Sequence, residues 1–72
     1  MKNQHKHIET FILSQGLNIG ENTVREIQEF MKNGGPRSSI DVYGRDVKTG
    51  LPRRIEFTWS ELKHNLDRDE QG

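Results

Sequence analysis

The segment 33–36, Asn-Gly-Gly-Pro, divides the chain into two parts with different hydrophobic periods. Before it, apolar residues recur at spacings of three and four, which is the period of a helix with one buried face. After it, apolar and polar residues alternate, which is the period of a strand with one face in solvent. A glycine pair followed by proline ends a helix, because none of the three favours helical continuation. The chain is therefore predicted to form helices first and strands second, an α+β fold.

Two helices are predicted before this break, at about 5–15 and 23–32. Gly16 ends the first, because glycine adopts the positive φ that often terminates a helix. Thr23 and Glu26 have the spacing of a capping box at the start of the second helix. The predicted core of the domain consists of apolar side chains with matching periodicity: Ile8, Phe11, Ile12, Leu17, Ile19, Val24, Ile27, Met31, Ile40, Val42, Ile55, Phe57, Trp59 and Leu62.

Two strands are predicted after the break, at about 38–45 and 53–58, joined by a turn at 49–50. Pro52 donates no backbone hydrogen bond, so we expect it where the ladder needs no donor. A last helix is predicted at 59–66, with Thr58 and Glu61 as a second capping box. The predicted order is ααββα: two helices packed on a β-hairpin and a C-terminal helix. We expect one domain over residues 1–66 and a charged, flexible tail over 67–72.

Composition limits what the chain can be. Its 72 residues include no cysteine, so neither a disulfide nor a thiolate zinc site stabilises the fold. Formal net charge is zero, which predicts neither nucleic acid nor an anionic membrane as partner. No apolar run is long enough for a signal peptide or a membrane span, so a soluble, cytoplasmic protein is expected.

The search for catalytic motifs is negative. The sequence contains no Walker loop, no GxGxxG and no GxSxG. His5 and His7 are two residues apart, so on a helix they face different sides and cannot share a metal. We therefore expect no catalytic residue, no cofactor and no metal site, and no enzymatic activity.

Positive charge gathers only around the predicted hairpin, at Arg37, Arg45, Lys48, Arg53 and Arg54. Such a cluster could bind phosphates, as in a small nucleic-acid-binding protein or transcription regulator. The alternative is pairing with the neighbouring acidic residues across the strands, and the balanced charge favours it. Nucleic acid is thus the less favoured partner.

Three segments of the chain resemble MreB, the actin-like protein that shapes rod bacteria. They are IGENTVREI at 19–27, DVYGRD at 41–46 and TGLPR at 49–53, in the family's order and at compatible spacing. The helix at 9–13 is similar to the segment that precedes them in the family, so the resemblance covers roughly 5–66. Gln28 stands where the family has a lysine, and Phe30 where it has an acidic residue.

The resemblance implies the fold of subdomain IIB, a small lobe of the actin-like structure, without the phosphate loops that its ATPase requires. In actin-like filaments this lobe meets the next subunit, so an actin-like filament subunit is the expected protein partner. The expected partner-binding residues surround the hairpin loop: Arg45, Lys48, Leu51 and Arg53. Two hypotheses remain open. The chain is a natural small protein that regulates such a filament, which Met1 and the polar end at 67–72 favour, or it is a structural remnant without independent function.

Overall fold

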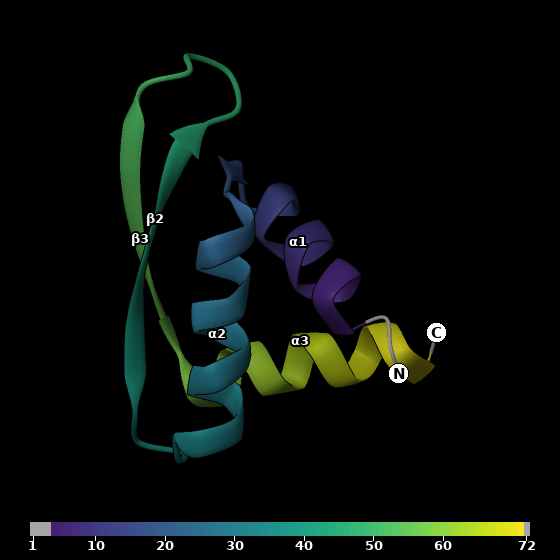
Figure 1. The fold of residues 1–72 in the computed structure, drawn as a ribbon. Coiled ribbons are helices and arrows are strands. Elements are labelled where there is room, and N and C mark those ends of the chain that lie inside the picture. The colour runs from purple at the N-terminus through teal and green to yellow at the C-terminus, as the bar shows by residue number, and fades with distance from the viewer. Residues whose placement is uncertain (1–3, 72) are drawn as a thin grey trace.

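The computed structural model describes the backbone of residues 4–71 and the side chains of 5–67. Its elements follow the predicted order, with one addition, a two-residue strand between the first two helices (Figure 1). They are α1 (Gln4–Ser14), β1 (Leu17–Asn18), α2 (Glu21–Asn33), β2 (Ser39–Asp46), β3 (Pro52–Thr58) and α3 (Trp59–Gln71). The α+β fold class is confirmed.

The sheet has three antiparallel strands in the order β1-β2-β3, rather than the predicted hairpin alone. β1 pairs with the end of β2, so that Leu17 lies opposite Asp46 and Asn18 opposite Arg45. Leu17 was predicted to turn inward, and it is fully buried. A two-residue strand carries no alternation that a sequence pattern could show, so the pairing itself was missed.

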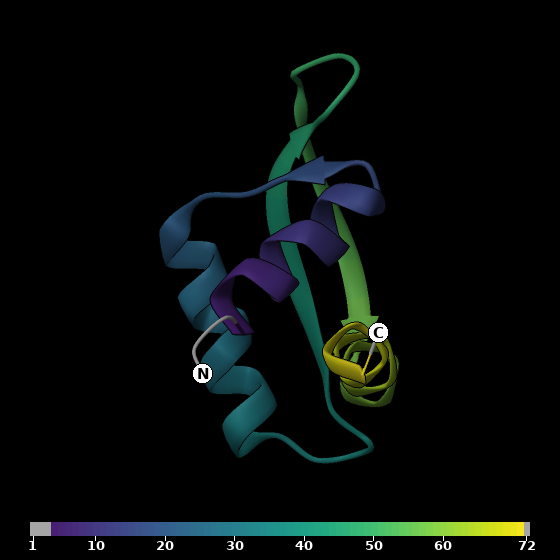
Figure 2. The ribbon, with the colours of Figure 1, turned by 90° about the vertical axis from the view of Figure 1, so that its right-hand side faces the viewer.

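All three helices lie on one side of the hairpin, and the other face of the hairpin is left open (Figures 1 and 2). The buried core lies between the helices and the inner face of the strands. It consists of Ile8, Phe11, Ile12, Leu17, Ile19, Val24, Ile27, Val42, Phe57, Leu62 and Leu66. Leu66 was absent from the predicted core. Met31, Ile40, Ile55 and Trp59 were included in it but are only partly buried.

The ends of the helices agree with the prediction in part. Gly16 has a φ of 87° after α1, as expected. The capping box predicted at Thr23 is wrong, because α2 begins earlier, with extended Gly20 as its cap and no side-chain hydrogen bond there. Glu21 in the first turn supplies the favourable negative charge instead.

α3 begins where predicted but ends later. The Thr58 hydroxyl oxygen accepts a hydrogen bond from the Glu61 N–H at 3.1 Å, as one half of the predicted capping box requires. The helix continues to Gln71 instead of ending at 66, because no glycine or proline interrupts 67–71. That 67–72 is flexible stays a prediction, and residue 72 lies outside the described residues.

Gly44 of β2 lies so near to β1 and to the following residue, Ile19, that there is no room for a side chain. A Cβ built on Gly44 would lie 2.9 Å from Ile19 Cγ2 and 3.0 Å from Leu17 Cγ, and closer still to the Asn18 carbonyl oxygen. Real Cβ atoms essentially never come this near to backbone. The pairing of β1 with β2 therefore needs a residue without a side chain at this position.

We predict that Gly44→Ala destabilises the protein by ~1–3 kcal/mol, because β1 must move away from β2 to admit the methyl group. Urea unfolding followed by circular dichroism measures the loss. Gly35→Ala is the matched control, since a Cβ at Gly35 meets nothing within 4 Å. Equal unfolding midpoints for the two variants would contradict the assigned contact.

Candidate functional site

The turn between β2 and β3, residues 46–53, is held by the carboxylate of Asp46; we call it the hairpin tip. Asp46 Oδ2 accepts hydrogen bonds from the backbone N–H groups of Lys48 at 2.9 Å and Thr49 at 3.0 Å. Asp46 Oδ1 accepts from Arg53 Nη1 at 2.9 Å. One side chain thus fixes both the start of the loop and the first residues of β3.

These contacts favour the ionised form of Asp46. The hydrogen bond from the Thr49 N–H, then that from the Lys48 N–H, and the Arg53 guanidinium lower the pKa of the Asp46 carboxyl below its ordinary value of 3.8. The tip is therefore most strongly held where Asp46 carries its negative charge.

Backbone bonds close the turn as the Thr49-Gly50 pattern predicted. Gly50 has a φ of 75°, and its N–H donates to the Asp46 carbonyl oxygen at 2.8 Å. Arg45 Nη1 donates to the Gly50 carbonyl oxygen at 2.8 Å, so this guanidinium lies against the loop. The loop is a defined structure with several independent restraints.

The hairpin tip is also tied to the body of the molecule at Gly16. The Val47 N–H donates to the Gly16 carbonyl oxygen at 3.0 Å. Arg53 Nη1 lies 3.3 Å from where a Cβ of Gly16 would be, so the guanidinium covers the end of α1. The tip therefore keeps a fixed position relative to the helices.

Two apolar side chains of the hairpin tip point into solvent. Leu51 is 63% exposed and Val47 is 48% exposed. The structure thus places the four predicted partner-binding residues in or next to one loop: Leu51 is exposed, the Arg45 guanidinium lies against Gly50, and that of Arg53 is turned back to Asp46. Sequence analysis did not single out Val47 as exposed or Asp46 as the residue that organises the loop. The Asp46-x-x-Thr49-Gly50 pattern, typical of a side-chain-capped turn, was the available signal.

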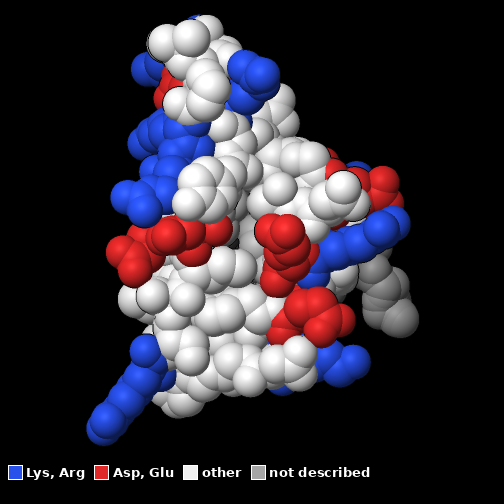
Figure 3. Space-filling view, turned by 60° about the vertical axis from the view of Figure 1, so that its left-hand side comes forward, with Lys and Arg blue, Asp and Glu red and all other residues white. Residues whose placement is uncertain are grey.

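The basic residues of the hairpin are partly paired across the strands. Arg54 Nη1 lies 3.4 Å from Asp41 Oδ2, in addition to the pair between Arg53 and Asp46. On the outer face, positive side chains lie toward the tip and a band of negative ones lies beside them (Figure 3). These pairs agree with the interpretation that the basic residues of the hairpin pair with acidic residues across the strands instead of binding phosphates.

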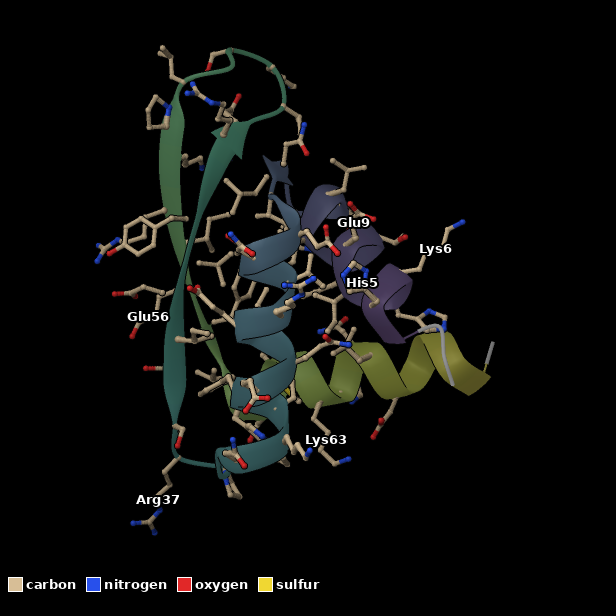
Figure 4. The ribbon with its side chains drawn as sticks, in the orientation of Figure 1. His5, Lys6, Glu9, Arg37, Glu56 and Lys63 are labelled. Atoms are coloured by element: carbon tan, nitrogen blue, oxygen red, sulfur yellow. The ribbon has the colours of Figure 1, made fainter. Side chains whose placement is uncertain are left out.

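An open groove of about 530 Å³ lies between α2 and α3. Trp59 lines this groove, and its Nε1 donates a hydrogen bond to the Met31 carbonyl oxygen at 3.1 Å. Lys63 Nζ lies 5.7 Å from the centre of the Trp59 ring. Figure 4 marks Lys63 on the first half of α3. The groove is lined by Gln28, Glu29, Met31, Lys32, Trp59, Lys63, Leu66 and Asp67.

Within the part of the chain that the structure describes, no three His, Cys, Asp or Glu side chains gather as metal ligands would. Nor does any described helix combine the length and apolar character needed to cross a membrane.

Two solved structures resemble most of this chain. The structure of MreB 5 of Spiroplasma citri bound to AMPPNP matches with a TM-score of 0.77 and 24% identity over 92% of this chain. That of MreB5 of Spiroplasma citri bound to ADP matches with a TM-score of 0.74 and 25% identity over 88% of this chain. This chain covers only 21% and 20% of those proteins. Neither protein-family models nor curated proteins yield a match. The resemblance to a segment of MreB is confirmed.

We predict that Asp46→Asn lowers stability in a pH-dependent way. Because the folded-state pKa of Asp46 is lowered, its contribution is fully present above 3.8 and is lost as the pH falls through the folded-state pKa. Urea unfolding midpoints of the variant and the parent should differ at neutral pH and converge in acid. Asp41→Asn, which removes an exposed ion pair together with the like charge opposite Glu56, is the control with a small effect. A difference for Asp46→Asn that stayed constant with pH would refute this role.

Proposed function

We propose that the chain is a non-enzymatic interaction module of the cytoplasm that docks on a subunit of an actin-like filament through its hairpin tip. The observation that carries this proposal is the likeness of 92% of the chain to part of an MreB protein, combined with an exposed apolar tip. The resemblance to the actin-like family implies that such a fold carries a surface of the kind that filament subunits use, which supports the proposal.

The hairpin tip has the chemistry of a small interface. Leu51 and Val47 supply apolar anchors, and Lys48 together with Arg45 beside the tip supplies a charged rim. Interfaces are commonly built from a few buried anchors inside such a rim. The hydrogen bonds of Asp46 order the tip before binding, so that less conformational entropy is lost when a partner binds.

In actin-like filaments the corresponding lobe meets the next subunit. A chain that carries this surface without the opposite one occupies a filament end and cannot extend it, because head-to-tail growth needs two complementary surfaces. One loop buries less than the standard ~800 Å² per partner, so the proposed binding is weak and reversible. The chain would then act as a stopper of filament growth.

The absence of ATPase activity is part of the same proposal. The two similar structures hold AMPPNP and ADP, and this chain covers about a fifth of each. Gln28, at the position of the family's lysine, lines the open groove between α2 and α3. Because the sequence has neither the lysine charge at position 28 nor a phosphate loop, the groove should bind a nucleotide only weakly.

We predict that the chain slows polymerisation of an MreB-type protein, measured by light scattering at roughly tenfold molar excess of the chain. Leu51→Asp should abolish the effect, because it places a negative charge at the apolar anchor. Tyr43→Ala is the matched control: Tyr43 is also 63% exposed but lies on the strand, outside the tip.

Polymerisation that is unchanged by the parent chain, together with no co-sedimentation, would remove the stopper proposal and favour a structural remnant. An effect that Tyr43→Ala abolishes and Leu51→Asp retains would move the interface off the hairpin tip.

For nucleotides we predict no saturable heat when ATP is titrated into the chain at about 50 µM, since binding should be weaker than about 1 mM. Gln28→Lys is the informative companion, because it restores the family's positive charge without restoring a phosphate loop. Saturable binding by the parent chain in this range would contradict a non-nucleotide role.

A further inference from the structure

Among the strands of residues 4–71, β3 lies at the edge of the sheet, with β2 on one side and no strand on the other. The Asp46 N–H donates to the Leu51 carbonyl oxygen, and the Trp59 N–H donates to the Ser38 carbonyl oxygen. In an antiparallel ladder the hydrogen-bonded positions alternate, so the odd-numbered residues of β3 bond to β2. The backbone groups of Arg54 and Glu56 therefore point to the open edge.

The central residue of β3, Ile55, is flanked by two charged residues of opposite sign. Arg54 precedes Ile55 and Glu56 follows it, and both charged side chains lie on the exposed outer face. Ile55 faces the core but is only partly buried. A strand with this order is complementary to itself when the second copy runs antiparallel about Ile55.

Glu56 is a charged residue of the outer face whose charge is not balanced by the residue opposite it. It lies directly opposite Asp41, a like charge that destabilises a strand pair. Its carboxylate accepts from the Ser39 hydroxyl at 3.0 Å, while the neighbouring Arg54 pairs with Asp41. Among the described residues Glu56 has no cationic partner, and its side chain points away from the helices (Figure 4).

We propose that two copies of the chain associate by antiparallel pairing of β3 with β3, centred on Ile55, to form one continuous sheet. This association is independent of the docking proposed for the hairpin tip. Arg54 of each copy lies opposite Glu56 of the other, and these two residues exchange backbone hydrogen bonds. The two Ile55 side chains cover each other on the inner face.

The charges select this register. Centring the pair on Arg54 would place two arginines opposite each other, and centring it on Glu56 would do the same with two glutamates. Pro52, which has no N–H, falls opposite Thr58, where its carbonyl oxygen still accepts a bond. A strand of another protein would offer this complementarity only by chance, whereas a second copy always carries it.

Edge pairing of one short strand buries little surface, so the dimer is weak. The test is sedimentation equilibrium of the full chain up to about 1 mM, which should show a reversible monomer–dimer equilibrium. Glu56→Arg should raise the dissociation constant roughly tenfold or more, since both opposite-charge pairs become like-charge pairs. Glu9→Arg is the control, with the same charge change on α1 (Figure 4).

Glu56→Arg is not expected to harm the monomer, because it replaces the like charge opposite Asp41. Arg54→Glu should likewise weaken self-association, and an equimolar mixture of the two variants should restore dimers, since only the mixed pair is complementary.

If Arg54→Glu fails to fold, amide hydrogen exchange of the parent chain tests the proposal instead. The amides of Arg54 and Glu56 should gain protection as concentration rises, and that of Ile55 should be protected throughout. A chain that stays monomeric, or dimers in which Arg54 and Glu56 gain no protection, would overturn the proposal.

Discussion

The approach of β1 to β2 at Gly44 is the constraint on which the arrangement of the molecule depends. The atoms of Leu17, Asn18 and Ile19 occupy the space that a side chain at Gly44 would need. This contact joins the helical first half of the chain to the strands of the second half. It also sets the register in which Leu17 faces Asp46, and so places the end of α1 beneath the hairpin tip. The Val47–Gly16 hydrogen bond then completes the junction.

The hairpin carries both surfaces for which interactions are proposed, and they differ in character. The hairpin tip is ordered by side-chain hydrogen bonds to Asp46 and exposes Leu51 and Val47. The edge of β3 is ordered by the sheet and exposes backbone groups between charges of opposite sign. The described helices cover the inner face of the hairpin. Its outer face, the edge of β3 and the hairpin tip therefore remain accessible to a partner.

Much of the fold could be predicted from the sequence because its signals are local. The break at 33–36, the turn at 49–50 and the Thr58 cap each depend on residues close together in the chain. The residues of the candidate site could be proposed for the same reason, since they lie close together in the chain; that they bind a partner stays a prediction. The predictions that were wrong concern features without a local signal. The cap of α2 is a glycine with no side-chain bond, and α3 extends beyond its last apolar residue.

The sequence by itself determined the order of the elements, the helical and strand periods and the position of the turn, because propensity and periodicity act over a few residues. The tertiary structure alone decided that Leu17 and Asn18 form a third strand, that Gly44 admits them, and that β3 has an open edge with Glu56 facing Asp41. These features depend on contacts between residues far apart in the chain, and such contacts exist only once the core has brought helices and strands together.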